Sequence, residues 1–181
     1  MKYKLLKQQS LLDLTTKSQI RKLLKTFQCS KNEDLEDFIH NKAITFELNG
    51  RSRTYLLIDI KDKKLMGYFS ISITTLDISS LSNEIQKLLY GDNKIKNYYI
   101  PCYLIGQLGK SDICKNKIGK KLLKKSIEII YNNYLDLNGR FILIDAFNNE
   151  KLINFYKQYD FTEIEQITPK KESIKMIYWL V

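Results

Sequence analysis

The stretch that most constrains the fold runs from Tyr103 to Phe161, where strand-like and helix-like patterns alternate. In order it contains an apolar strand (Tyr103 to Leu108), a polar turn (Gly109 to Lys117), a helix (Ile118 to Tyr134), a strand (Arg140 to Phe147) and a short helix ending near Phe161. A strand that leads through a polar loop into a helix presents unpaired backbone N–H groups at the helix start. Such a helix start binds anionic groups, for example a pyrophosphate.

The rest of the chain adds further strands and helices on both sides of this stretch. We expect a strand at Tyr3 to Lys7, a helix at Lys17 to Phe27, a helix capped by Ser30 and running to about Leu48, a hairpin of Arg53 to Ile60 with Lys64 to Thr75, a short helix at Ser80 to Tyr90, and a final hairpin of Phe161 to Thr168 with Ser173 to Val181. Glu33 stands at the capping-box distance from Ser30. This order predicts an α/β fold with a mixed, mostly antiparallel central sheet flanked by helices.

Length and charge limit what the chain can be. Its 181 residues are 44% apolar, which is enough for one continuous core, so we expect a single domain over residues 1–181. Thirty Lys and Arg against 20 Asp and Glu give a net charge of +10. This balance suits an anionic ligand or nucleic acid, although lysines scattered over a solvated surface explain it equally well.

Cysteine usage and hydropathy indicate the compartment. Cys29, Cys102 and Cys114 are an odd number at irregular spacing, which argues against a disulfide framework and, with His40 as the only histidine, against a zinc site. The start of the chain is too polar for a signal peptide, and no apolar run approaches the ~20 residues of a membrane span. We therefore expect a soluble, cytoplasmic protein without a metal.

The segment from Asn149 to Phe161 resembles a motif of the GNAT family of N-acetyltransferases. The family pattern Asn-x-x-Ala-x-x-Phe-Tyr-x-x-x-Gly-Phe is matched with Leu152 in place of Ala and Asp160 in place of Gly. The resemblance covers nearly the whole chain, because the order of strands and helices is also similar. It implies acetyl-CoA as cosubstrate, with Asn149 holding its pantetheine part.

The same resemblance implies that Tyr156 is the general acid beside the sulfur of the cosubstrate. When an amine attacks a thioester, the leaving thiolate needs a proton, and a phenol with a pKa of about 10 can supply one to a thiolate of about 8.5. Alternatively, Tyr156 packs on the core face of its helix with Leu152 and Tyr159.

The polar turn resembles the family's pyrophosphate loop, Gln/Arg-x-x-Gly-x-Gly/Ala. The aligned residues are Cys114, Lys115, Asn116, Lys117, Ile118 and Gly119, so that only the last glycine is kept. Lys117 stands where a glycine normally lets the backbone approach phosphate. We expect Lys115, Lys117, Lys120 or Lys121 to compensate as charged phosphate ligands; otherwise the loop is an ordinary basic helix start.

The end of the preceding strand has a role in the family as well. Its backbone pairs with pantetheine, and one N–H polarises the thioester carbonyl. Leu108, Gly109 and Lys110 occupy these positions by the resemblance. Glycines in a strand can equally mark a bulge.

A fourth resemblance concerns one branch of the family. The residues Phe27-Gln28-Cys29-Ser30, Leu35 to Ile39 and Ala43 are similar to the Phe-x-Cys-Gly, Leu-x-x-Phe-Leu, Ala pattern of the branch with the tRNA-acetylating toxins, with Ser30 departing from Gly and Gln107 from Arg. This implies the amine of an aminoacyl-tRNA as acceptor, with the positive charge serving the phosphate backbone. An antitoxin partner and a homodimer belong to the same set of expectations.

A general base is not identified by the sequence. Glu47, Asp59 and Asp145 are candidates by residue type, but a capping or surface role is favoured for each. The amine of an aminoacyl ester is less basic than that of lysine, so water suffices as its base. His40 lies in a polar helical stretch and is expected to be solvated rather than catalytic.

The resulting hypothesis is acetyl transfer from acetyl-CoA to a primary amine by direct attack. The acceptor is a small molecule, a peptide or an aminoacyl-tRNA. The alternative is a degenerate GNAT domain that acts as a non-catalytic binding module, because most glycines of the loop are missing.

Overall fold

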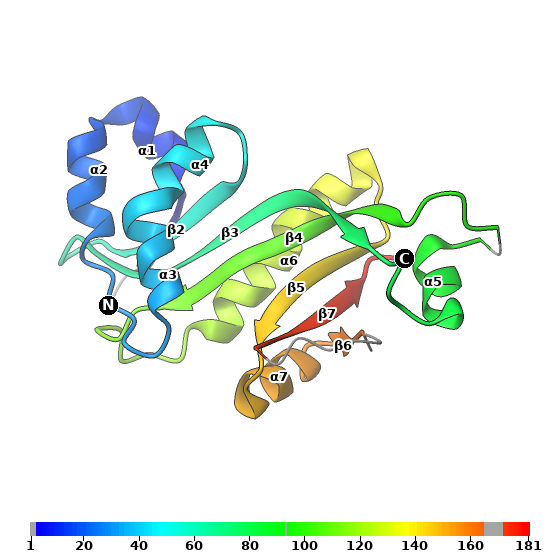
Figure 1. The fold of residues 1–181 in the computed structure, drawn as a ribbon. Coiled ribbons are helices and arrows are strands. Elements are labelled where there is room, and N and C mark those ends of the chain that lie inside the picture. The colour runs from blue at the N-terminus through cyan, green and yellow to red at the C-terminus, as the bar shows by residue number, and fades with distance from the viewer. Residues whose placement is uncertain (1–2, 93, 165–171) are drawn as a thin grey trace. The chain divides into compact units, whose positions relative to one another are not determined.

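The computed structural model describes residues 3–92, 94–164 and 172–181 (Figure 1). The strands are β1 (Tyr3–Lys7), β2 (Arg53–Asp59), β3 (Lys64–Asp77), β4 (Tyr99–Lys110), β5 (Phe141–Phe147), β6 (Thr162–Glu163) and β7 (Ser173–Trp179). The helices are α1 (Gln8–Leu14), α2 (Lys17–Leu24), α3 (Glu33–Asp37), the π-helix η1 (Phe38–Lys42), α4 (Ala43–Leu48), α5 (Asn83–Tyr90), α6 (Gly119–Leu137) and α7 (Glu150–Lys157). The strand order is β1-β2-β3-β4-β5-β7-β6. The predicted α/β fold, with a mixed, mostly antiparallel sheet flanked by helices, is confirmed.

The backbone groups into two compact units. Unit 1 comprises Met1–Ser72 and Ile105–Ile129, and unit 2 comprises Ile73–Leu104 and Ile130–Val181. Strands β3 and β4 and helix α6 each pass from one unit into the other. That residues 1–181 form one domain stays a prediction.

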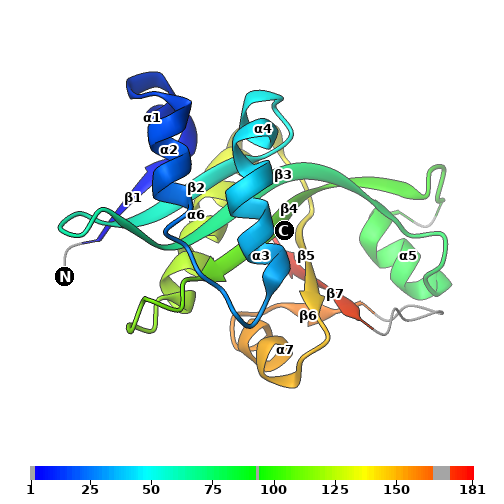
Figure 2. The same ribbon diagram turned by 60° about the vertical axis from the view of Figure 1, so that its left-hand side comes forward.

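In unit 1, two apolar clusters cover opposite faces of the antiparallel strands. Leu56 of β2 and Tyr68 of β3 belong to a cluster with helices α2, η1 and α4, whereas the neighbours Tyr55 and Leu57 pack with the first turns of α6. Successive side chains of a strand point to opposite faces, so this alternation places the helices on two sides (Figure 2). The predicted hairpin of β2 and β3 is confirmed.

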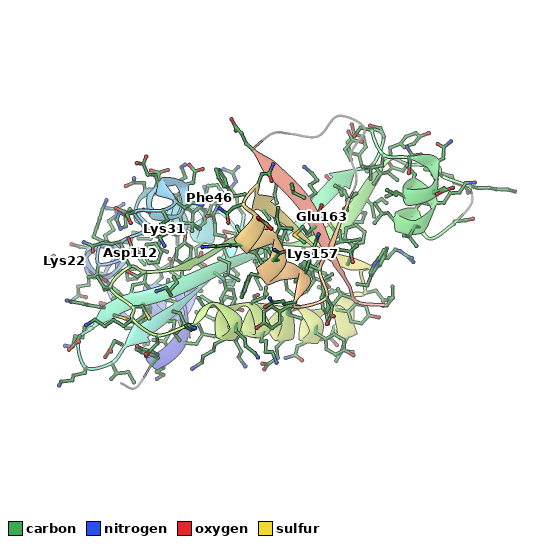
Figure 3. The ribbon with its side chains drawn as sticks, turned by 90° about the horizontal axis from the view of Figure 1, so that it is seen from below. Lys22, Lys31, Phe46, Asp112, Lys157 and Glu163 are labelled. Atoms are coloured by element: carbon green, nitrogen blue, oxygen red, sulfur yellow. The ribbon has the colours of Figure 1, made fainter. Side chains whose placement is uncertain are left out.

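In unit 2, β5 lies between a parallel and an antiparallel neighbour. Tyr103 of β4 is opposite Ile142 of β5, and β7 pairs with β5 along its length in antiparallel register. Helix α7 is joined to the short strand β6 by an ion pair of 2.7 Å between Lys157 Nζ and Glu163 Oε1 (Figure 3). The predicted last hairpin is present as β6 and β7, while residues 165–168 of that prediction lie outside the described residues.

Several predicted element limits were wrong. Helix α1 was not expected, because Gln8-Gln9-Ser10 gives a weak apolar period. The helix predicted from Lys17 to Phe27 ends at Leu24. Strand β4 continues through Lys110, two residues beyond the predicted end. Each of these limits depends on tertiary packing as well as on local preference.

The predicted helix cap at Ser30 was also wrong. The cap is Asn32, whose side-chain oxygen accepts the N–H of Leu35 at 3.2 Å. Ser30 instead donates its backbone N–H to the carboxylate of Asp112, far along the chain. A long-range hydrogen bond of this kind leaves no signal in the local sequence.

Candidate active site

The loop after β4 is a compact turn held by backbone hydrogen bonds and by one lysine side chain. Ser111 is fully buried and donates its N–H to the carbonyl of Met66 at 2.9 Å, and its carbonyl accepts the N–H of Cys114 at 3.0 Å. Lys110 Nζ donates to the carbonyl of Cys114 at 2.6 Å. The side chain of Lys110 therefore closes the turn.

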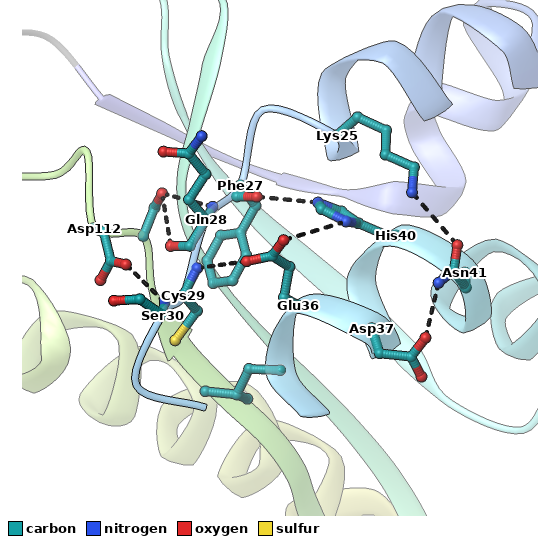
Figure 4. A network of polar contacts seen from close by, with 12 residues as sticks. Lys25, Phe27, Gln28, Cys29, Ser30, Glu36, Asp37, His40, Asn41 and Asp112 are labelled. Carbon is teal, nitrogen blue, oxygen red and sulfur yellow. Dashed lines mark hydrogen bonds and ion pairs between the residues drawn. The ribbon is translucent and has the colours of Figure 1, made fainter. Parts of the chain in front are cut away.

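This turn is joined to the segment that resembles the toxin branch (Figure 4). Ser111 Oγ accepts the N–H of Gln28 at 3.1 Å and lies 3.3 Å from its carbonyl oxygen, which also accepts the N–H of Asp112 at 2.8 Å. Asp112 Oδ2 accepts the N–H of Ser30 at 2.7 Å, and this hydrogen bond lowers the pKa of Asp112. Two motifs about 80 residues apart in sequence thus form one structure.

Glu36 and His40 make a second set of polar contacts with the same segment. Glu36 Oε2 accepts the N–H of Cys29 at 2.8 Å, and the carbonyl of Phe27 lies 3.0 Å from His40 Nε2. A carbonyl can only accept a hydrogen bond, so Nε2 of His40 carries the hydrogen. The other ring nitrogen, Nδ1, lies 3.9 Å from Glu36 Oε1. The side chain of His40 is only 11% exposed, and the prediction that it is solvated was wrong. The π-helix η1 directs it inward, which the sequence did not indicate.

Because Gly109 has no side chain, Phe27 and Leu35 can approach the end of β4 closely. The residue is buried, and a Cβ atom there would lie 3.2 Å from Phe27 Cζ and 3.2 Å from Leu35 Cδ1. Leu108 is half-buried in the cluster beneath α6. Any function of these positions toward a ligand therefore rests on their backbone.

The predicted phosphate loop divides into buried and exposed residues. Cys114 and Ile118 are buried in the apolar cluster of unit 1, so their side chains are structural. Lys115, Lys117 and Lys120 are exposed. Asn116 Nδ2 donates to the hydroxyl of Tyr3 at 2.8 Å, and Gly119 begins α6.

Helix α7 in unit 2 carries the other predicted site residues. Asn149 is its N-cap, with Oδ1 accepting the N–H of Leu152 at 3.3 Å. Tyr156 is 5% exposed, and its ring packs against those of Phe155 and Phe161 with centroids 5.4 and 5.6 Å away. Burial raises the pKa of Tyr156 to about 12, so the phenol is protonated at neutral pH.

The end of α7 explains why the family carries glycine where this chain has Asp160. The N–H of Phe161 donates to the carbonyl of Tyr156, and the N–H of Asp160 donates to the carbonyl of Lys157. This is the hydrogen-bond pattern of a Schellman motif. Asp160 has φ of 65°, the left-handed conformation that favours glycine. The motif from Asn149 to Phe161 thus encodes both caps of one short helix.

Replacing Asp160 with glycine should relieve this left-handed conformation. We expect the free energy of unfolding to rise by up to about 1 kcal/mol, because the steric cost of a Cβ outweighs the extra chain entropy of glycine. Chemical denaturation of Asp160→Gly measures the change, with Asp160→Ala as the matched control that should lower stability. A glycine variant less stable than the native chain would contradict the assignment.

The three candidate bases all form hydrogen bonds or ion pairs with other groups of the chain. Glu47 is buried and accepts Thr54 N–H at 2.8 Å and Arg53 Nη1 at 2.5 Å. Asp59 is buried and accepts the N–H of Lys61 at 2.9 Å. Asp145 lies 3.7 Å from Lys175 Nζ. All three therefore have structural contacts, but Glu47 and Asp59 are buried, so the prediction of a surface position was wrong for them.

The cysteines offer neither a disulfide nor a metal site in the described part of the chain. Cys29, Cys102 and Cys114 are buried and unpaired, and burial raises the pKa of Cys102 to about 12. Over residues 3–92, 94–164 and 172–181, no three His, Cys, Asp or Glu side chains gather to hold a metal ion. In the same part of the chain, every helix is too short or too polar to cross a membrane.

Comparison with known proteins shows the class of fold. No protein-family model matches the sequence, and no curated protein matches it either. Solved structures do match, and the fold they share with this chain is the GNAT-like acetyltransferase fold that the sequence predicted.

Three of these structures come from toxins. A bacterial toxin aligns over 99% of this chain and 91% of its own, with a TM-score of 0.73 and 18% identity. AtaT complexed with acetyl-methionyl-tRNAfMet aligns over 86% of both chains, with a TM-score of 0.67 and 19% identity. An AtaT toxin with a tyrosine-to-phenylalanine mutation, bound to the C-terminus of the antitoxin AtaR and acetyl-CoA, aligns over 87% of this chain and 85% of its own, with a TM-score of 0.63 and 16% identity.

Proposed function

We propose that this chain is an N-acetyltransferase that moves an acetyl group from acetyl-CoA to a primary amine. The observation that carries the proposal is its fold, which matches a toxin structure containing acetyl-CoA and another containing an acetylated aminoacyl-tRNA. The segment from Asn149 to Phe161 supports it independently, because it follows the family pattern in sequence and forms a capped helix.

Residues 108–120 would hold the cosubstrate. The backbone of Leu108, Gly109 and Lys110 would pair with pantetheine, and N–H groups of residues 115–117 and 119 would receive the pyrophosphate at the start of α6. The exposed side chains of Lys115, Lys117 and Lys120 would add positive charge. In unit 2, Asn149 caps α7 through its oxygen, which leaves its amide nitrogen to donate to pantetheine.

In this mechanism the acceptor amine attacks the acetyl carbon while the chain stabilises the charge that develops. A backbone N–H at the end of β4 donates to the carbonyl oxygen as it becomes an oxyanion. The carbon–sulfur bond then breaks with its electron pair going to sulfur, where Tyr156 donates from its hydroxyl. Water removes the proton from the attacking nitrogen.

The raised pKa of Tyr156 makes it a weaker proton donor than an ordinary phenol. Full proton transfer from a phenol of pKa about 12 to a thiolate of about 8.5 is uphill by about 5 kcal/mol. Tyr156 would therefore stabilise the leaving sulfur mainly by hydrogen-bond donation in the transition state, and the released thiolate would take its proton from water. This differs from the well-matched proton donor that the sequence suggested.

The same pKa gives a prediction for the dependence of rate on pH. A phenol of ordinary pKa is half deprotonated at pH 10, whereas Tyr156 keeps its proton there. The turnover should show no alkaline decline below pH 10, and the stability that the neutral phenol contributes should be lost only as the pH rises from 10 toward 12. Turnover between pH 7 and 10.5, with circular dichroism at each pH, tests this; a midpoint below pH 10 in folded protein contradicts it.

For the acceptor we propose the amine of an aminoacyl-tRNA. The AtaT complex with acetyl-methionyl-tRNAfMet and the +10 charge support this choice. An antitoxin partner is proposed on the AtaT structure with AtaR, and a homodimer and a cytoplasmic location stay proposals. The binding-module alternative retains one supporting observation, namely Lys117 at the position of a family glycine.

Acetyl transfer from radiolabelled acetyl-CoA tests the proposed function and its acceptor together. Mixed aminoacyl-tRNA should be labelled, deacylated tRNA should not, and a lysine peptide should be labelled far more slowly. Labelling of the peptide alone would overturn the tRNA acceptor but keep the enzyme. No labelling of any amine would favour the binding module.

A further inference from the structure

Tyr3 of β1 contacts the loop that precedes α6, although 113 residues separate Tyr3 from its partner there. Asn116 Nδ2 donates a hydrogen bond to the hydroxyl of Tyr3 at 2.8 Å. Both residues belong to unit 1. The contact therefore joins the first strand of the chain to the loop that the proposed function assigns to the pyrophosphate.

The ring of Tyr3 is fixed by contacts of its own. Its backbone pairs with Asp59 of β2 in antiparallel register. The ring packs against the apolar cluster that contains Cys114 and Ile118, the buried residues on either side of Asn116. Burial and the neighbouring Cys114 raise the pKa of Tyr3, so the hydroxyl is protonated at neutral pH. A hydroxyl held in this way is a fixed anchor for an exposed side chain of the loop.

The loop depends on side-chain contacts for its shape. Lys117, which stands at the position of a family glycine, lies outside the left-handed region, so a lysine fits this backbone without strain. Lys110 Nζ donates to the carbonyl of Cys114 at 2.6 Å, which holds the first residue of the loop. Tyr3 holds the middle of the loop through the side chain of Asn116.

We propose that Tyr3 is a positioning residue for the cosubstrate. Its hydroxyl holds Asn116 so that the N–H groups of residues 115–117 are presented to the pyrophosphate. The inference rests on the proposed function, because it concerns the same loop. N–H groups that are already ordered bind an anion more tightly than mobile ones, since less conformational entropy is lost on binding. Tyr3 acts through Asn116 and makes no contact with the acetyl group.

Calorimetric titration of Tyr3→Phe with acetyl-CoA tests this inference on the full chain. The substitution keeps the ring and removes the hydroxyl, and circular dichroism confirms that the variant folds. We expect the affinity for acetyl-CoA to fall by about threefold to tenfold, the effect of one hydrogen bond, because binding then has to order the loop. S-acetylpantetheine lacks the pyrophosphate, so its affinity, titrated in the same way, should be unchanged.

A double-mutant cycle shows whether Tyr3 acts through Asn116. Asn116→Ala should weaken acetyl-CoA binding to a similar extent, and the double variant should lose no more than either single variant. Tyr55→Phe is the matched control, because Tyr55 packs in the same cluster on the neighbouring strand, with its ring stacked on that of Phe69 at 5.0 Å. It should bind acetyl-CoA as the native chain does. Amide hydrogen exchange of residues 115–117, measured without acetyl-CoA, should be faster in Tyr3→Phe and unchanged in Tyr55→Phe.

Several outcomes would overturn the inference. These are native affinity for acetyl-CoA in Tyr3→Phe, an equal loss of affinity for S-acetylpantetheine, or additive losses in the double variant. In each of them the native chain still binds acetyl-CoA, so the proposed function stands. A native chain that does not bind acetyl-CoA would overturn the proposed function and this inference together, and that result is seen before any variant is tested.

Discussion

Replacing Tyr156 with phenylalanine is expected to lower the turnover of acetyl transfer by about 10²- to 10³-fold, the usual cost of removing a hydrogen-bond donor that stabilises charge in the transition state. The ring would keep its packing against Phe155 and Phe161, so fold and affinity for acetyl-CoA should be nearly unchanged. Removing an interaction that is made only in the transition state lowers the turnover and leaves substrate binding unchanged. Single-turnover rates and a binding titration separate the two effects.

The matched control is Tyr159→Phe on the following turn. Its ring also packs on Phe155, at 5.2 Å, but it lies outside the family motif's reactive position. This variant should retain turnover within a few-fold of the native chain. If Tyr156→Phe retains it equally well, Tyr156 is a core residue and the mechanism needs another acid.

Replacing Gly67 with alanine is expected to have the second-largest effect. A Cβ there would lie 2.8 Å from Ile118 Cδ1 and 2.9 Å from the carbonyl oxygen of Gly109. The backbone at Gly109 cannot yield as a side chain does, so we expect the free energy of unfolding to fall by about 1 to 3 kcal/mol. Because the end of β4 is proposed to pair with the cosubstrate, the affinity for acetyl-CoA should fall as well.

Gly50→Ala is a control for that result. Gly50 has φ of 66°, and a Cβ added there would meet no atom within 4 Å, so its substitution costs stability through backbone conformation alone. Denaturation should show a loss in both variants, whereas calorimetry should show weaker acetyl-CoA binding only in Gly67→Ala. Unchanged cofactor affinity in Gly67→Ala would remove the end of β4 from the proposed site.

The sequence predicted the architecture because apolar periodicity is a local signal. β1, the hairpin of β2 and β3, and α6 were found within a few residues of their limits. The motif from Asn149 to Phe161 was also recognised from the sequence, and the structure shows that its two ends are helix caps. Capping depends on neighbours in sequence, but the cap predicted at Ser30 and found at Asn32 shows that a long-range contact can compete with it.

The parts that escaped prediction depend on distant contacts. The joining of Ser111 and Asp112 to Gln28 and Ser30 uses backbone groups, which every residue type offers. The inward position of His40 follows from a π-helix that residue preferences do not specify. The depth at which Tyr156 is buried, which sets its pKa, likewise comes from packing in unit 2.

The most direct test of the proposed enzyme is a calorimetric titration of the folded chain with acetyl-CoA, because cosubstrate binding separates an enzyme from a degenerate domain. The proposal predicts saturable binding at one site per chain, with a Kd well below about 1 mM and an affinity that weakens as salt screens the lysines of the loop. Absence of binding at about 1 mM acetyl-CoA, in protein shown to be folded, would contradict it.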